Sequence, residues 1–224
     1  KLSVDRDNRL LSRGPRYRLD AEVLRDQALA ISGLLQRQPG GPSVRPYQPA
    51  GLWKVVAITG SNTQDFKRDD GDALYRRSLY TFWKRTSPPP SMSVFNAPTR
   101  EQCTVRRERT NTPLQALTLM NDTQYVEAAR EFAELAVANA TDDHQLAAWM
   151  LRRALVVTPN EKDVAALVAL AENCRQRFEQ QPDDAQSLLK TGESTIDVSL
   201  DPIRLAAWTV VANTIMNRDD FVSK

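Results

Sequence analysis

Glycine and proline are distributed unevenly along this chain, and the asymmetry restricts the folds open to it. Seven of the eight glycines precede residue 72, and the chain beyond residue 110 is rich in alanine and leucine. That composition favours helices, because glycine and proline weaken helix interiors. We therefore predict a mainly α-helical protein that forms one compact unit. We expect residues 1–110 to form a loop-rich half with a helix at 20–38, and residues 111–224 to form a helical bundle.

Capping residues mark the helix starts in the second half. Thr112 precedes Pro113 and is followed three residues later by Gln115, which predicts a capping box. The last predicted helix is apolar on nearly all sides, so we expect it at the centre of the bundle. The other starts are expected at Asp122, at Asp142 or Asp143, at a second capping box that begins at Thr158, and at Asp201.

Two segments of the first half are ambiguous. Residues 52–58 are apolar and suit either a helical turn or a strand. Residues 72–86 carry large apolar side chains at helical spacing, although residues 79–83 have the composition of a strand. We predict a helix over 72–86, because Asp72 is a good capping residue and no partner strand is evident.

The overall charge and the few metal-binding residues exclude several functions. Thirty basic and 28 acidic residues leave a net charge of +2, which gives no reason to expect nucleic acid. No apolar run approaches the roughly 20 residues needed to span a membrane. Two distant cysteines and one histidine exclude a thiolate-rich or two-histidine metal site. We expect neither a metal nor a cofactor in this chain.

Arginines gather just before the predicted helix at 113–121. Arg106, Arg107, Arg109 and Asn111 could bind an anion beside a helix N-terminus. The same arginines could instead form a structural network with nearby carboxylates. Exposed guanidinium groups would favour ligand binding, whereas buried and paired groups would favour the structural alternative.

Four other residues are weaker candidates for ligand contact. Arg76 and Arg77 lie in an aromatic and basic segment that could stack sugars or bases, or could pack as core. Tyr47 and Trp53 lie in a proline-rich region where loops position recognition groups, so they could form a sugar platform. The alternative for both pairs is a structural role.

Carboxylates are the main candidates for catalysis. Asp69, Asp70 and Asp72, or Glu108, could supply the pair of carboxylates used in glycoside hydrolysis. The chain contains no catalytic motif, so we favour a non-catalytic protein. If the protein is exported, Cys103 and Cys174 could pair, provided that they lie close together.

Several segments of the sequence resemble one family. Residues 7–15, 75–86 and 106–117, together with the C-terminal 205–213, are similar to segments of a C-terminal domain of unknown function. That domain occurs in exported planctomycete multidomain proteins, which often carry an N-terminal planctomycete-type cytochrome c domain. The haem-attachment motif CxxCH is absent from this sequence.

The resemblance implies an exported or envelope-associated bacterial parent protein, of which this chain is expected to be a fragment. It implies no reaction and no catalytic residue. We expect an interaction module that binds an acidic protein or glycan, or other domains of the parent chain. A polysaccharide hydrolase and a docking surface for a cytochrome c domain are the alternatives.

Overall fold

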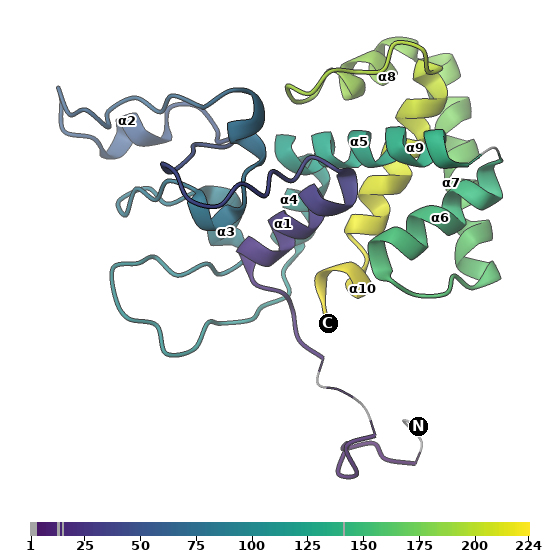
Figure 1. The fold of residues 1–224 in the computed structure, drawn as a ribbon, viewed down its shortest axis with the longest axis horizontal. Helices are drawn as coiled ribbons and strands as arrows, with labels where there is room; N and C mark the ends of the chain where they lie inside the picture. The colour runs from purple at the N-terminus through teal and green to yellow at the C-terminus, as the bar shows by residue number, and fades with distance from the viewer. Residues whose placement is uncertain (1–3, 13, 15, 141) are drawn as a thin grey trace.

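The computed structural model describes residues 4–12, 14, 16–140 and 142–224, and it confirms the mainly α-helical prediction. Figure 1 shows a helical bundle at one end and a loop-rich half at the other. The described residues contain no β-strand and only three isolated bridges. The helices are α1 (Ala21–Ser32), α2 (Leu52–Val56), α3 (Pro90–Val94), α4 (Pro113–Asn121), α5 (Thr123–Asn139), α6 (Asp143–Leu155), α7 (Glu161–Gln180), α8 (Pro182–Leu189), α9 (Pro202–Met216) and α10 (Asp219–Val222), with 3-10 helices η1 (Gly71–Tyr75) and η2 (Ser78–Tyr80).

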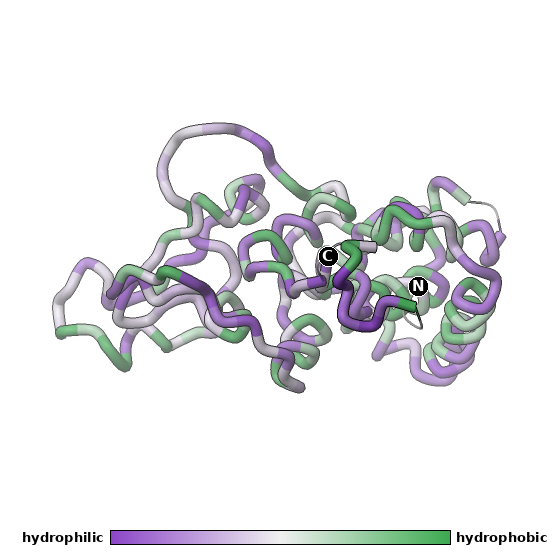
Figure 2. Tube along the Cα trace, turned by 90° about the horizontal axis from the view of Figure 1, so that it is seen from below, coloured by the Kyte–Doolittle hydropathy of each residue, from purple (hydrophilic) through white to green (hydrophobic). Residues whose placement is uncertain are grey.

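Helix α9 lies at the centre of the bundle, as its apolar sequence predicts. It packs against α5, α7 and α8. Trp208, Ala212 and Met216 on α9 are each at most 1% exposed. Figure 2 shows hydrophobic and hydrophilic stretches alternating along the bundle helices, as expected of helices that bury one face. No helix in the described part of the chain combines the length and apolar character that a membrane crossing requires.

Helix α1 joins the loop-rich half to the bundle. It packs against α5, and its Leu24 shares a hydrophobic core with Phe132. The helix ends at Ser32, which corrects the predicted end near residue 38. Gly33 has a φ of 84°, and its N–H donates to the carbonyl of Ala30, which closes the helix.

The predicted helix over residues 72–86 is wrong, since η1 and η2 take its place. Between them Arg76 is extended, with φ −64° and ψ 156°. The buried Arg25 guanidinium donates to the carbonyl oxygens of Leu74 and Arg76, at 2.6 and 2.8 Å. Those carbonyls therefore accept tertiary hydrogen bonds instead of the backbone hydrogen bonds of a continuing helix. Asp72 does not act as a cap.

Most predicted helix starts are confirmed. Thr112 and Gln115 form the capping box of α4. Asp122, Asp142 and Asp201 cap α5, α6 and α9 through their side chains. One predicted cap differs, and one ambiguous segment is resolved. Asn160, and not Thr158, caps α7, and the ambiguous residues 52–58 form the short helix α2.

Candidate functional site

Residues 98–112, here named the arginine loop, lie between α3 and α4 and have no regular secondary structure. Figure 1 shows the loop extending from the body beside α3. At its start, the indole nitrogen of Trp83 donates to the carbonyl of Thr99 at 3.0 Å. The Arg100 guanidinium lies 4.6 Å from the Trp83 ring centroid. Arg100 has a φ of 64°, which is uncommon for a residue other than glycine.

The far end of the arginine loop is fixed by side-chain hydrogen bonds. The Thr110 hydroxyl accepts from the amide of Asn96 at 2.8 Å and from the amide of Gln115 at 3.1 Å. Gln115 is 1% exposed and belongs to the α4 capping box. The last residues of the loop are therefore tied to a fixed helix start.

Arg107 ties the middle of the arginine loop to α1. Its two terminal nitrogens donate to the two oxygens of Glu22 at 2.6 and 3.1 Å. Asp20 lies 3.6 Å away. Partial burial raises the pKa of Glu22, but the hydrogen bonds and charge of Arg107 outweigh burial and hold that pKa below its usual value. Arg107 thus matches the structural alternative and positions its neighbours.

Removing this pair should destabilise the protein in a pH-dependent way. Because the folded state lowers the pKa of Glu22, the pair adds stability above the ordinary value of 4.5. That stability is lost as the pH falls through the folded pKa. We expect Arg107→Ala to lower the free energy of unfolding by about 1 kcal/mol at neutral pH, since solvent screens a partly exposed pair. Urea titrations at pH 7 and pH 3 should show the difference shrinking in acid, whereas an equal loss at both values would contradict the pairing.

Arg106, Arg109 and Asn111 are exposed. Neither arginine forms an ion pair with a carboxylate of the described residues. The Arg109 guanidinium lies over the Tyr17 ring, 4.4 Å from its centroid. Residues 106–110 line a hollow of about 430 Å³. The arginine loop therefore presents two unpaired guanidinium groups to solvent beside one that is held by α1.

The two other arginine candidates face different surroundings. Arg76 is buried and donates to the carbonyls of Pro42 and Gly40, so it holds the proline-rich segment in place. It is not positioned for a ligand. Arg77 is exposed, with its Nε 3.6 Å from a carboxylate oxygen of Asp26.

The two aromatic candidates do not form an exposed sugar platform. Trp53 is only 3% exposed and packs against Phe66 and Phe82, with ring centroids 5.0 and 5.6 Å away. Tyr47 is half-buried, and the Arg68 guanidinium lies 5.1 Å from its ring centroid. Both residues are used by the packing of the loop-rich half.

The candidate carboxylates each have a local partner or an exposed position. Asp69 accepts from the backbone N–H of Arg45, Asp70 pairs with Arg68, and Asp72 accepts from the Gln36 amide. Glu108 lines the hollow of the arginine loop. Cys103 and Cys174 are both free thiols, so the structure contains no bond between them.

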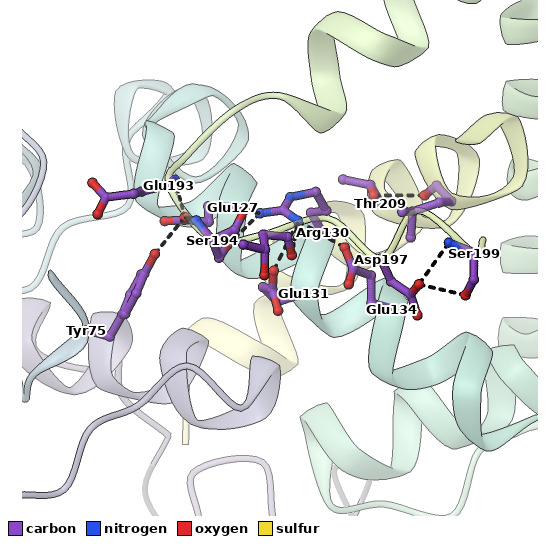
Figure 3. Close-up of polar contacts among 12 residues, drawn as sticks. Tyr75, Glu127, Arg130, Glu131, Glu134, Glu193, Ser194, Asp197, Ser199 and Thr209 are labelled. Atoms are coloured by element: carbon purple, nitrogen blue, oxygen red, sulfur yellow. Dashed lines mark hydrogen bonds and ion pairs between the residues drawn. The ribbon is translucent and has the colours of Figure 1, made fainter. Parts of the chain in front are cut away.

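A buried polar cluster, here named the Glu127 latch, was not predicted. Figure 3 shows Tyr75 from the loop-rich half and Ser194 from the loop after α8 converging on Glu127 of α5. One oxygen of Glu127 accepts from the Tyr75 hydroxyl at 2.9 Å, from the backbone N–H groups of Glu193 and Ser194 at 2.6 and 2.7 Å, and from the Ser194 hydroxyl at 2.9 Å. Glu127 is 1% exposed. The latch joins three parts of the chain that are distant in sequence.

Arg130 continues this polar cluster one turn further along α5. It is 1% exposed and donates to Glu134 at 2.9 Å and to the carbonyl of Ser194 at 2.8 Å. The only sequence signal near these contacts is Gly192, the single glycine of the helical half. Its φ of 97° permits the turn that brings residues 193 and 194 to Glu127.

The described residues form a mainly helical protein with an exposed basic loop. The family described as "PSD1: Protein of unknown function (DUF1553)" matches residues 1–171, which is more than half of the chain. The chain therefore belongs to that family. No curated protein and no solved structure matches this chain.

Proposed function

We propose that this chain is a non-catalytic interaction module that binds an anionic ligand through the arginine loop. The observation that carries the proposal is the exposure of Arg106 and Arg109 without carboxylate partners among the described residues. Both lie on a loop that Arg107 and the α4 capping box hold in place. A loop fixed in this way presents its guanidinium groups to carboxylate, sulfate or phosphate oxygens, and its backbone loses little conformational freedom on binding.

The proposal extends to the parent protein through the sequence resemblance. We place the chain in an exported planctomycete protein in which other domains are the nearest candidate partners. A cytochrome c domain of the same parent would be one of them, and it would carry any haem itself. In this arrangement the acidic ligand is a surface of another domain or an anionic glycan of the cell envelope.

Binding to simple polyanions tests the proposal. The probes are a heparin oligosaccharide and a polyglutamate peptide, titrated at low salt. We expect the double variant Arg106→Ala/Arg109→Ala to bind both about 5- to 30-fold more weakly, since two exposed charge contacts contribute about 1–2 kcal/mol together. Raised salt should weaken binding of the unmodified protein more than that of the variant.

The matched control removes two exposed positive charges elsewhere. Arg152 on α6 and Lys162 on α7 are both exposed, and Arg152→Ala/Lys162→Ala should change either affinity by less than twofold. Equal losses in the two double variants would show that only net charge matters. That result, or an absence of binding to both probes, would refute a site on the arginine loop.

A further inference from the structure

Two neighbouring hollows lie along the outer face of α1. One has a volume of about 440 Å³ and the other of about 280 Å³. Both are lined by Val23, Asp26 and Arg77, so they adjoin at these residues. We name the surface formed by the two hollows the α1 groove. Arg37 lines only the first hollow and Arg100 only the second.

The groove has apolar side chains along its length. Val23 is 49% exposed and Leu79 is 66% exposed. Ala30 and Leu35 add partly exposed apolar surface in the first hollow. Large apolar side chains that line a concave surface are available for contact with another molecule.

The charges in the groove divide into paired and unpaired groups. Glu22 and Asp20 face Arg107, and Asp26 lies 3.6 Å from Arg77 while accepting from the backbone N–H of Ser78. Arg37, in contrast, forms no ion pair with the described carboxylates. Arg100 forms none either, although its guanidinium lies over the Trp83 ring and its charge helps to lower the pKa of Glu22. Each hollow therefore contains one arginine without a direct carboxylate partner among the described residues.

This pattern fits an extended protein segment. The part of α1 that lines the groove runs from Glu22 to Ala30, which spans about 12 Å at a rise of about 1.5 Å per residue. An extended chain covers that length with about four residues at about 3.3 Å each. A segment of about four apolar residues with an acidic residue on each side would therefore match the length of this part of α1 and would offer one carboxylate to each hollow.

A glycan fits the same groove less well. Aromatic side chains offer a flat apolar face on which a sugar ring can stack. Tyrosine and tryptophan add a hydrogen-bonding group to that face. Among the described residues, no aromatic side chain lines either hollow. Aliphatic side chains such as Val23 and Leu79 instead complement the apolar side chains of a peptide.

We infer that the α1 groove binds an extended acidic peptide segment whose apolar residues contact Val23 and Leu79 and whose flanking carboxylates pair with Arg37 and Arg100. This inference rests on the proposed function, because it specifies the acidic partner of the basic surface. It adds a second contact region on α1 to the arginine loop.

A labelled synthetic peptide tests the inference by fluorescence anisotropy. The probe carries two glutamates that flank four leucine and valine residues, with glycine and serine at both ends. Two control peptides replace the glutamates by lysines or the apolar residues by serines. We expect the probe to bind the unmodified protein at least tenfold more tightly than either control, since both the charge and the apolar contacts are required. Equal binding of the three peptides would overturn the inference.

Variants then locate the peptide. Leu79→Asp and Arg37→Glu change exposed side chains, so both should fold, and each should weaken the probe at least fivefold. The matched controls are Leu114→Asp and Arg152→Glu, at exposed positions outside the groove lining. Melting curves confirm folding, and Val23→Asp replaces Leu79→Asp if the latter unfolds. Unchanged affinity in the groove variants would overturn the inference.

The peptide experiment tests the α1 groove, and the polyanion experiment tests the arginine loop, so either site can fail without the other. If heparin and polyglutamate binding depends on Arg106 and Arg109 while the probe ignores the groove variants, the α1 groove is refuted and the arginine loop remains. If the probe depends on Leu79 and Arg37 while the polyanions ignore the loop variants, the arginine loop is refuted as an anion site.

Discussion

Replacing Gly192 by alanine should lower the free energy of unfolding by about 3 kcal/mol or more. A Cβ atom at this position would lie 2.4 Å from the carboxylate carbon and from one oxygen of Glu127. That spacing is far inside van der Waals contact, so either the turn or the buried carboxylate must move. The φ of 97° adds backbone strain for any residue other than glycine. Denaturant titrations followed by circular dichroism measure the loss.

Gly60→Ala is the matched control. Gly60 has a φ of 80°, but a Cβ there would have no atom within 4 Å. Its substitution should cost only the backbone term, about 1–2 kcal/mol. A Gly192→Ala loss no greater than that of Gly60→Ala would mean that the turn adapts without disturbing Glu127.

The sequence predicts helices best where local chemistry decides them. The capping box at Thr112 and the aspartates of the helical half place α4, α5, α6 and α9, because a cap uses residues within one turn of the helix start. The segment from Asp72 fails for the opposite reason. Its backbone carbonyls are bound by Arg25, about 50 residues earlier, and no local pattern reveals that contact.

In the candidate site, too, local features can be predicted from the sequence and long-range contacts cannot. The cluster of arginines at 106–109 is visible in the sequence, and so is the helix start that follows it. The sequence cannot show that Glu22 pairs with Arg107 while Arg106 and Arg109 have no carboxylate partner among the described residues. Glu22 lies 85 residues before Arg107 in the sequence. The sequence likewise leaves the choice between a platform and a structural role for Trp53 open, because its burial depends on Phe66 and Phe82 and not on the composition of the surrounding loop.

Glu127 illustrates a buried charge that sequence patterns conceal. It lies on α5 among alanines, where a glutamate reads as a solvent-exposed helix residue. Its partners come from η1 and from the loop after α8, which meet only in the folded protein. The carboxylate therefore acts as a junction between the loop-rich half and the bundle.

Glu127→Ala should be the second strongly destabilising substitution, with a loss of about 3–5 kcal/mol in the free energy of unfolding. Removing the carboxylate leaves the Tyr75 hydroxyl and the N–H groups of Glu193 and Ser194 without their acceptor, and unsatisfied buried donors are costly. Burial, together with the charge and hydrogen bond of Glu127, raises the pKa of Tyr75, so this hydroxyl stays protonated and needs an acceptor.

Glu127→Gln separates the acceptor from the charge. The glutamine keeps one carbonyl oxygen for the same donors, so we expect a smaller loss of about 1–2 kcal/mol, the difference between charged and neutral hydrogen bonds. Glu179→Ala, at an exposed position of α7, controls for removing a glutamate from a helix and should have little effect. Urea titrations of the three variants should give Glu127→Ala a much lower free energy of unfolding than Glu127→Gln. If the two substitutions at Glu127 proved equally mild, the carboxylate would not hold the turn, and the Gly192→Ala loss would have to arise from backbone strain alone.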